Sequence, residues 1–286
     1  MNIMKTAFVF PGGGSLGAIE VGMLKALVES GIHADMAVGA SVGSINGTYY
    51  AAQPDIDGVL GLEQLWLQTK RSNVFPKNLF YSAMGLIQKN HLIKRDALRK
   101  LVEENIPVKR LEDTKIPVYI VAMDINTGEE VIFSSGPSVP AILASAAIPM
   151  VFEPVELGHH TLVDGGVLNN TPISIAVENR AERVVILTAG YTCARKEAPK
   201  SVIEMAMTSS DYLVHKRVEL DLKIYAPSVD LRIIPSLCPL ETGSHDFSKT
   251  PELITRGYNQ AKEWLDAGML TAKDIVPKVR PIHTHD

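Results

Sequence analysis

Cysteine is scarce in this sequence of 286 residues. The 2 cysteines, Cys193 and Cys238, cannot build a disulfide framework, and neither stands in a spacing typical of metal ligands. A reducing compartment is the default for such a chain. We therefore expect a cytoplasmic protein that holds no metal ion and no other cofactor.

Long apolar runs are also missing. No stretch approaches the roughly 18 residues that a membrane-spanning helix needs. The first ten residues lack both the apolar core and the small-residue cleavage site of a signal peptide. We expect neither a transmembrane helix nor a signal peptide, so any contact with a membrane would be peripheral.

An excess of charge of one sign is absent as well. The chain carries 28 Lys and Arg against 32 Asp and Glu, a formal net charge of −4. A dedicated nucleic-acid-binding protein would show a basic surplus. We therefore expect no nucleic-acid partner.

What the sequence does contain is a regular alternation of short apolar segments with helical patterns. Strands are predicted at residues 6–10, 36–39, 117–123, 130–133, 161–163, 183–188 and 231–234. This alternation predicts an α/β fold of three layers, α/β/α, with a mostly parallel central sheet. With 46% hydrophobic residues and no linker-like segment, we expect a single domain over residues 1–286, with a core at about 5–190 and a mainly helical C-terminal part at about 195–286.

A glycine-rich segment, Gly12-Gly13-Gly14-Ser15-Leu16-Gly17, separates the first predicted strand from the first predicted helix. Consecutive glycines let the backbone turn sharply and leave bare N–H groups beside a helix N-terminus, where negative charge is favoured. A plain strand-to-helix turn uses the same residues. The segment alone therefore does not separate a binding loop from a turn.

The spacing of these glycines also matches a dinucleotide-binding loop. That interpretation requires an acid at the end of the next strand to hold a ribose. The nearest acid, Asp35, precedes that strand, and small residues occupy its end. No Lys-Ser or Lys-Thr pair follows the glycines, which excludes a P-loop, so we do not expect nucleotide binding.

A G-x-S-x-G sequence, Gly39-Ala40-Ser41-Val42-Gly43, follows between the second predicted strand and a helix. Small neighbours allow the strained turn that exposes a serine hydroxyl, although a plain turn of small residues is the alternative. In a parallel sheet this position places Ser41 and the N–H groups of the glycine-rich segment at one edge. Ser41 is therefore the candidate nucleophile.

A serine hydroxyl needs a base to take its proton. Asp164 ends the strand predicted at residues 161–163 and is followed by Gly165 and Gly166, which leave its carboxylate at a strand end. Asp164 is the candidate base, while an Asx turn explains the same three residues.

A histidine base is a second arrangement that stays open. It would form a triad in the chain order Ser41, Asp164 and then His215 or His245, as in α/β-hydrolases. The α/β-hydrolase fold usually presents its serine after several strands, whereas Ser41 follows the second predicted strand. This order argues against the triad.

Together these segments resemble the patatin-like phospholipase family. The three blocks Gly12-Gly13-Gly14-x-x-Gly17, Gly39-x-Ser41-x-Gly43 and Asp164-Gly165-Gly166 stand in the order of that family. The segments that join them agree too, at residues 144–149 and at Asn169-Asn170-x-Pro172. The resemblance covers about residues 5–190 and, more faintly, residues 246–258.

The resemblance implies a patatin-like fold and hydrolysis of lipid acyl esters by a Ser-Asp dyad without histidine. By position, Ser41 resembles the nucleophile and Asp164 the base. Gly13 and Gly14, with a contribution from Gly12, resemble the donors of the oxyanion hole. Phospholipids, lysophospholipids and neutral glycerides all fit such a dyad, so the resemblance implies a lipid or acyl-ester substrate without naming one.

One position departs from the family's pattern. Leu16 stands where the glycine block commonly carries arginine or lysine. The departure puts in doubt the contribution of a cation at the helix N-terminus. It also keeps open a catalytically weak or silent lipid-binding protein.

A basic stretch lies between residues 70 and 100, where eight lysines and arginines stand against one aspartate. Aromatic and aliphatic residues are interspersed with these charges. Such a mixture suits peripheral contact with an anionic membrane or the covering of a lipid cleft. It equally suits a helical surface whose apolar residues pack inward and whose lysines are solvated.

Overall fold

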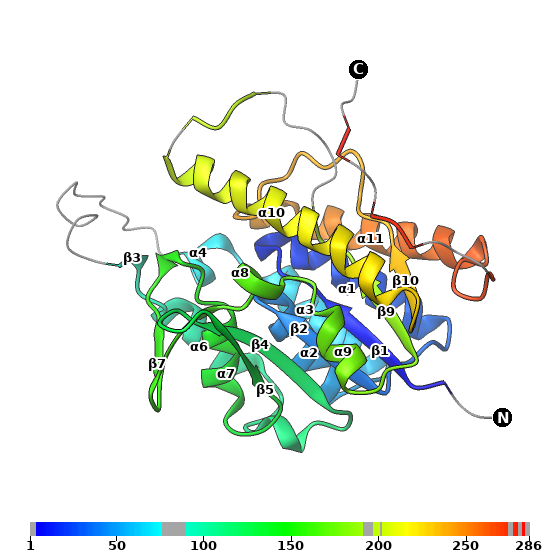
Figure 1. Cartoon of the computed structure of the whole chain (residues 1–286), viewed down its shortest axis with the longest axis horizontal. Helices are drawn as coiled ribbons and strands as arrows, with labels where there is room; N and C mark the ends of the chain where they lie inside the picture. Colours follow the sequence, from blue (N-terminus) through cyan, green and yellow to red (C-terminus); the bar gives the residue numbers. More distant parts are fainter. Residues whose placement is uncertain are drawn as a thin grey trace.

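A central sheet runs through the molecule in the computed structural model, which describes residues 4–75, 90–190, 197–200, 202–273, 277–279 and 282–283 (Figure 1). Its strands are β1 (Thr6–Phe10), β2 (Met36–Ala40), β4 (Val118–Asp124), β5 (Glu129–Phe133), β7 (Val155–Leu157), β8 (His160–Asp164), β9 (Arg183–Leu187) and β10 (Asp230–Ile234). Following the hydrogen-bonded pairs, the strands succeed one another as β10-β9-β1-β2-β4-β8-β7. Strands β2 and β8 pair with successive halves of one side of β4, and β5 pairs with the opposite side.

The pairing is parallel from β10 through β9, β1 and β2 to β4, and antiparallel for β5, β8 and β7. The predicted mostly parallel sheet is therefore confirmed, and each of the seven predicted strands is present with its ends shifted by at most two residues. A separate parallel pair joins β3 (His91–Ile93) to β6 (Met150–Phe152).

Helices cover both faces of the sheet, because successive side chains of the buried strands point to opposite faces. Phe8 and Phe10 of β1 pack in one core with helices α1 (Gly17–Glu29), α2 (Val42–Ala52), α3 (Ile56–Gln68), α7 (Ser138–Ser145) and α11 (Thr250–Asp266). Ala7 and Val9 pack in the other with α9 (Ile173–Glu178) and α10 (Val202–Tyr225). Figure 1 shows the resulting three layers.

The basic stretch between residues 70 and 100 contains α4 (Arg71–Val74) and the first half of α6 (Asp96–Asn105), and its residues 76–89 lie outside the described residues. Helix α6 buries Leu98 and Val102, but charged residues outnumber its apolar ones. Its hydrophobic stripe is therefore narrow, and no helix was predicted there. The strands β3, β6 and β7 are too short to show a period.

Two strands meet end to end beside β4. Strand β2 pairs with the first half of β4, where Ala40 lies opposite Val121. Strand β8 runs in the opposite direction and pairs with the second half, where Asp164 lies opposite Ala122. Because β5 occupies the other side of β4, β2 and β8 share one side. The carboxyl ends of both strands therefore point at each other, at neighbouring positions of β4.

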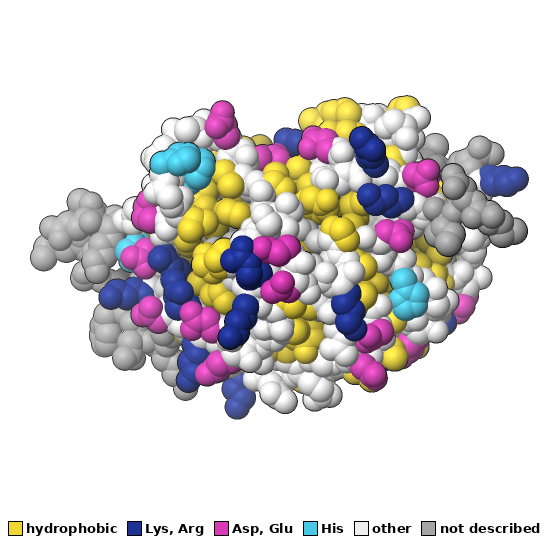
Figure 2. All heavy atoms as spheres, turned by 90° about the horizontal axis from the view of Figure 1, so that it is seen from below, with side chains coloured by type: hydrophobic (Ala, Val, Ile, Leu, Met, Phe, Trp, Pro, Cys, Tyr) yellow, Lys and Arg dark blue, Asp and Glu magenta, His cyan; other side chains and the backbone are white. Residues whose placement is uncertain are grey.

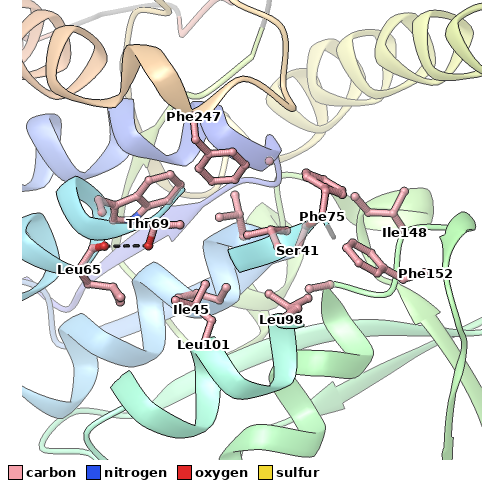
Figure 3. Close-up of a pocket in the computed structure, with 15 residues that line it drawn as sticks. Ser41, Ile45, Leu65, Thr69, Phe75, Leu98, Leu101, Ile148, Phe152 and Phe247 are labelled. Carbon is pink, nitrogen blue, oxygen red and sulfur yellow. Dashed lines mark hydrogen bonds between the residues drawn. The ribbon is translucent and has the colours of Figure 1, made fainter. Parts of the chain in front are cut away.

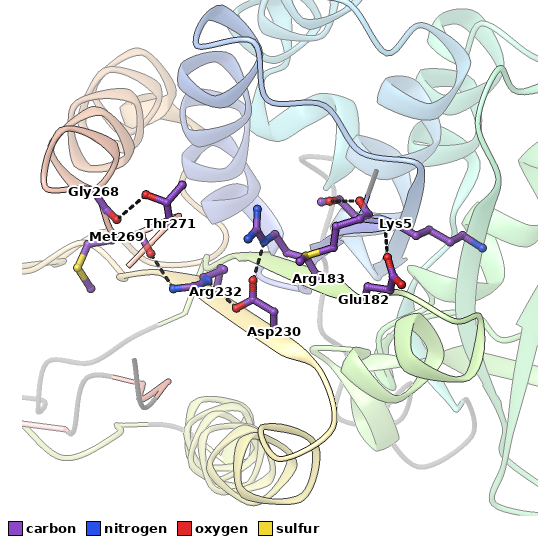
Figure 4. Close-up of polar contacts among 10 residues, drawn as sticks. Lys5, Glu182, Arg183, Asp230, Arg232, Gly268, Met269 and Thr271 are labelled. Atoms are coloured by element: carbon purple, nitrogen blue, oxygen red, sulfur yellow. Dashed lines mark hydrogen bonds and ion pairs between the residues drawn. The ribbon is translucent and has the colours of Figure 1, made fainter. Parts of the chain in front are cut away.

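Polar contacts join neighbouring strands at the amino ends of the parallel strands, opposite to the carboxyl end of β2. At the amino ends of β9 and β10, Asp230 lies 2.7 Å from the Nε of Arg183 and 2.7 Å from the Nε of Arg232 (Figure 4). The N–H of Lys5, just before β1, donates to the Glu182 carboxylate at 2.9 Å. These contacts fix the register of the parallel strands far from the edge where β2 and β8 meet.

The close approach of α2 to β1 gives a test of this packing. A Cβ on Gly43 would lie 2.0 Å from the carbonyl oxygen of Phe10, whereas a Cβ on Gly47 would lie 3.3 Å from the Phe10 ring. We expect Gly43→Ala to lower the free energy of unfolding by at least about 2 kcal/mol, because the backbone must move. Gly47→Ala, on the same helix, should cost much less. Equal losses in chemical denaturation would contradict this account.

Candidate active site

Ser41 occupies the turn between β2 and α2. Its φ angle is +53°, a conformation that residues other than glycine rarely adopt. The backbone is held by three hydrogen bonds: its N–H donates to the Ser145 Oγ at 2.9 Å, and its carbonyl accepts from the N–H and the Oγ of Ser44 at 2.9 and 2.6 Å. The strained turn predicted from the G-x-S-x-G sequence is therefore present.

Small residues make this turn possible, and Gly39 and Gly43 flank it. A Cβ at either position would collide with backbone, since Gly39 faces the carbonyl of Gly43 and Gly43 faces that of Phe10. The helix can therefore begin directly over the end of β1. This approach brings Ser41 close to the loop that leaves β1.

Asp164 is the last residue of β8 and is 5% exposed. Its Oδ1 accepts from the N–H of Gly166 at 2.7 Å. Burial raises the pKa of Asp164 to about 7, although the interactions of its carboxylate with the Ser41 side chain and with the Gly166 N–H act in the opposite direction. The two residues singled out from the sequence are thus brought together, 123 positions apart in the chain, by the meeting of β2 and β8.

Ser145, on the last turn of α7, is a residue of this site to which the sequence analysis assigned no role. It is fully buried, and its hydroxyl donates to the carbonyl of Val121 at 2.6 Å while accepting from the Ser41 N–H. Along β4, the pairing with β2 ends at Val121 and the pairing with β8 begins at Ala122. Ser145 therefore fills the gap in the ladder and holds the strained backbone of Ser41.

The glycine-rich loop lies beside Ser41. The N–H of Gly12 donates to the carbonyl of Asn170 at 3.1 Å, and the Asn170 side chain donates to the carbonyl of Gly12 at 3.1 Å. The N–H of Gly12 is therefore occupied. The backbone N–H groups of Gly13 and Gly14 have no acceptor within the described ranges.

Gly14 is anchored from the other side of the loop. Its φ is +58°, and a Cβ there would lie 2.3 Å from the carbonyl of Ser244. That same carbonyl accepts from the N–H of Ser15 at 2.8 Å. The C-terminal part of the chain therefore holds the loop in place, which the sequence did not indicate.

Leu16 and Gly17 continue the loop into α1. The side chain of Leu16 is 1% exposed and packs in the hydrophobic core. Position 16 therefore faces inward and not toward the cavity beside Ser41. A hydrophobic residue fits this environment, which gives the departure from the family's pattern a packing reason.

The two histidines of the alternative triad lie elsewhere. His215, on α10, has its Nε2 3.3 Å from the Glu219 carboxylate, and His245 is exposed on the loop before α11. Within the described part of the chain, no histidine is hydrogen-bonded to Ser41 or to Asp164. The geometry therefore favours the dyad over the triad.

Ser41 opens into a hydrophobic cavity of about 60 Å³ (Figure 3). Its walls come from several parts of the chain: the first turn of α2, the end of α3, α4 and Phe75, α6, and the residues that follow α7. The lining is apolar except for Ser41 and Thr69, and it carries no charged side chain among the described residues. Such a cavity suits an apolar group attached to the atom that Ser41 attacks.

Aromatic rings line one side of the cavity. The ring of Trp66 stacks on that of Phe247, with their centroids 6.2 Å apart. The Phe247 and Phe75 rings are tilted, with centroids 6.4 Å apart, and Phe75 stacks on Phe152, with centroids 5.6 Å apart. Phe75 belongs to the basic stretch, so part of that stretch does cover the cavity. The alternation of basic and apolar residues therefore reflects, at Phe75, packing over the candidate site.

In the described ranges, no group of three or more His, Cys, Asp or Glu side chains has the arrangement of a metal site. The described helices include none whose length and hydropathy would allow it to span a bilayer.

The chain is similar to known proteins. The family described as patatin-like phospholipase matches residues 8–177. A patatin-like phospholipase domain-containing protein of Caenorhabditis elegans is 29% identical over 190 residues, which cover 64% of this chain and 17% of the relative. An uncharacterized NTE family protein of Mycobacterium tuberculosis is 33% identical over 172 residues, which cover 59% of this chain and 45% of the relative. The chain thus spans less than half of either relative's length.

Among solved structures, VipD from Legionella pneumophila aligns with a TM-score of 0.48 at 13% sequence identity. The alignment covers 92% of this chain and 67% of VipD.

The role of Ser145 can be tested with a matched partner on the same helix. Ser138 is also fully buried, and its hydroxyl donates to the carbonyl of Val108 at 2.6 Å. Each Ser→Ala variant should lose about 1–3 kcal/mol of stability, because each removes the hydrogen bond that a buried serine hydroxyl donates to a backbone carbonyl. Only Ser145→Ala should also slow covalent labelling of Ser41 by a fluorophosphonate, by about tenfold to a hundredfold, since a small displacement of a nucleophile has that effect. Equal labelling rates in the two folded variants would remove this role.

Proposed function

Because the chain belongs to the patatin-like phospholipase family, we propose that it is a serine hydrolase of lipid acyl esters that works through a Ser41–Asp164 dyad. The observation that carries the proposal is the meeting of two residues: the side chain of Ser41, on the strained turn after β2, interacts with the buried carboxylate of Asp164 at the end of β8. A nucleophile and a base in contact at the wall of an apolar cavity are the parts that ester hydrolysis requires.

Acylation begins when the Ser41 hydroxyl attacks the carbonyl carbon of the ester. The hydroxyl proton passes to the carboxylate of Asp164 as the new C–O bond forms. When the tetrahedral intermediate collapses, Asp164 returns the proton to the leaving alcohol and the acyl group remains on Ser41. Water then repeats the cycle: it gives a proton to Asp164 and attacks the carbonyl carbon of the acyl-enzyme. The second tetrahedral intermediate collapses, the bond to the Ser41 oxygen breaks, Asp164 returns the proton to that oxygen and the fatty acid leaves.

The negative oxygen of each tetrahedral intermediate needs donors that are already in place. The N–H groups of Gly13 and Gly14 meet this need, because no described acceptor occupies them and the contacts at Ser244 hold the loop. An oxyanion donor is typically worth about 3 kcal/mol of transition-state stabilisation. Gly12 contributes through its carbonyl and N–H contacts with Asn170, which hold the loop beside Ser41.

Asp164 suits the role of a base because of its environment. An exposed aspartate is too weak a base to take a serine proton near neutral pH. Burial raises the pKa of Asp164 to about 7, which makes it a stronger base that is still ionised in part of the molecules at pH 7. A histidine is therefore not required.

A silent lipid-binding protein is less well supported. That alternative depended on Leu16, and its side chain packs in the core. The strained turn of Ser41 and the burial of Asp164 both cost stability, and simple binding of a lipid would need neither.

Turnover of an acyl ester tests the dyad. Ser41→Ala should abolish turnover and fluorophosphonate labelling. Asp164→Asn should lower turnover by at least about a hundredfold, as expected for loss of a general base. In the wild type, kcat/KM should rise with pH and reach half of its maximum near pH 7, because only the ionised carboxylate can accept the proton and the pKa of Asp164 is about 7.

Two controls separate chemistry from folding. His215→Ala and His245→Ala should keep their turnover, and a large loss in either folded variant would contradict the dyad. Asp164→Asn should remain folded at pH 8. The pKa of Asp164 lies above that of an unfolded aspartate, so the native state is more stable with Asp164 protonated, and the free energy of unfolding falls as pH rises toward 7. A neutral amide at this position does not ionise, so the Asn variant should not show this fall.

We further propose that the basic stretch at residues 70–100 brings the protein to anionic membranes. Lys94 and Lys100 are exposed, and Phe75 of the same stretch covers the cavity. Other charges of the stretch are already engaged: Arg95 donates to the carbonyls of Glu153 and Pro154. On the face shown in Figure 2, basic and acidic side chains are interleaved with hydrophobic patches. An anionic membrane would therefore be attracted by the lysines of the stretch and not by a wide basic surface.

Cosedimentation with vesicles of mixed anionic and neutral lipid tests this proposal. Lys94→Gln/Lys100→Gln should weaken binding by at least about tenfold, since a basic residue near such a surface contributes about 1 kcal/mol. The control is Lys5→Gln/Lys115→Gln, at the amino ends of β1 and β4. Lys115 pairs with Asp55 at 3.5 Å much as Lys100 pairs with Glu104 at 3.8 Å. Equal binding by both double variants would refute the proposal.

A further inference from the structure

Two cavities share one side chain as a wall. The cavity beside Ser41 has a volume of about 60 Å³, and a second cavity of about 250 Å³ lies between α4 and α6. Leu101, on α6, lines both of them. The second cavity is otherwise lined by Ser72, Asn73, Ala97, Lys100 and Glu104.

The wall at this point is thin. Leu98 and Leu101 follow each other on one side of α6, and both line the cavity beside Ser41. Leu98 is 4% exposed and does not border the second cavity, whereas Leu101 is half-buried and does. On the outer side, Lys100 and Glu104 form an ion pair at 3.8 Å. The side chain of Leu101 therefore separates the two spaces.

Leu101 also lies at one end of the cavity beside Ser41. In Figure 3, Ile45 and Leu101 lie on the side of Ser41 opposite to Phe247. The aromatic rings lie on the other side of Ser41. A group attached to Ser41 that runs past Ile45 therefore meets Leu101.

The volume limits what can fit there. A space of this kind needs about 10–15 Å³ for each water-sized group, so a cavity of about 60 Å³ holds about four to six of them. A methylene group is similar in size to a water molecule. The cavity therefore matches a short acyl chain.

We propose that Leu101 sets the length of the acyl chain that the site accepts and restricts the enzyme to short-chain esters. This inference rests on the proposed function, because it requires an acyl group on Ser41. The selectivity then comes from a closed end on α6, not from the head group or the alcohol.

Removing the wall should open the second cavity to the chain. With Leu101→Ala the two spaces join, and the aliphatic parts of Lys100 and Glu104 can cover additional methylene groups. Each additional methylene group that moves from water into the protein should raise kcat/KM about fourfold, which corresponds to its transfer free energy. A longer acyl chain gains from several such groups at once.

The experiment measures kcat/KM for p-nitrophenyl esters from four to sixteen carbons. The wild type should be most active on esters of about four to six carbons and decline beyond them. Leu101→Ala should raise the ratio of kcat/KM for the ten-carbon ester over the four-carbon ester by at least tenfold. Leu101→Phe should shift the preference toward the shortest esters, which keeps the test informative if Leu101→Ala does not fold.

Leu98→Ala is the matched control. It enlarges the cavity beside Ser41 without joining it to the second one, so its ten-to-four-carbon ratio should rise much less than that of Leu101→Ala. Equal rises would overturn the inference, as would a wild type that prefers twelve or more carbons. These outcomes differ from failure of the proposed function, in which no ester is turned over and no fluorophosphonate labels Ser41.

Discussion

The meeting of β2 and β8 beside β4 is the constraint on which the candidate site depends. Two strands that run in opposite directions share one side of a third, so their carboxyl ends approach each other at Val121 and Ala122. Ser41 leaves one end and Asp164 is the other. Asp164 is the last residue of β8 and Ser41 directly follows the last residue of β2, so the pairing of the two strands with β4 sets their relative position. Ser145 completes the arrangement by pairing with the backbone that the two strands leave open at Val121.

The same constraint explains the chemistry of the site. A carboxylate at the inner end of a strand is surrounded by protein, and burial is the largest influence on the pKa of Asp164. The interactions with the Ser41 side chain and with the Gly166 N–H lower the pKa but do not offset this burial. The site thus combines a candidate nucleophile on a strained turn with a candidate base whose pKa is near neutral.

The walls of the cavity beside Ser41 come from parts of the chain that differ in how they are packed. Helices α1 and α2 begin at the centre and pack in the main core, and the loop at Ser244 holds the glycines. Helices α4 and α6 stand at the outer side, where Phe75 and Leu101 close the cavity. Substrate selectivity would then be decided by helices that can vary without disturbing Ser41 and Asp164.

The strands of the sheet and its mostly parallel order could be predicted from the sequence, and so could the two candidate residues at its centre, because strands of small and β-branched residues and turns of glycine are local signals. Gly39 to Gly43 and Asp164 to Gly166 are such turns. The engagement of Gly12, the inward direction of Leu16, the role of Ser145 and the wall at Leu101 were decided only by the tertiary structure. Each depends on contacts between segments distant in the chain, such as α7 with β4, and no local pattern records which segments meet. The antiparallel entry of β8 belongs to this second group, and it is what turns two separate motifs into one site.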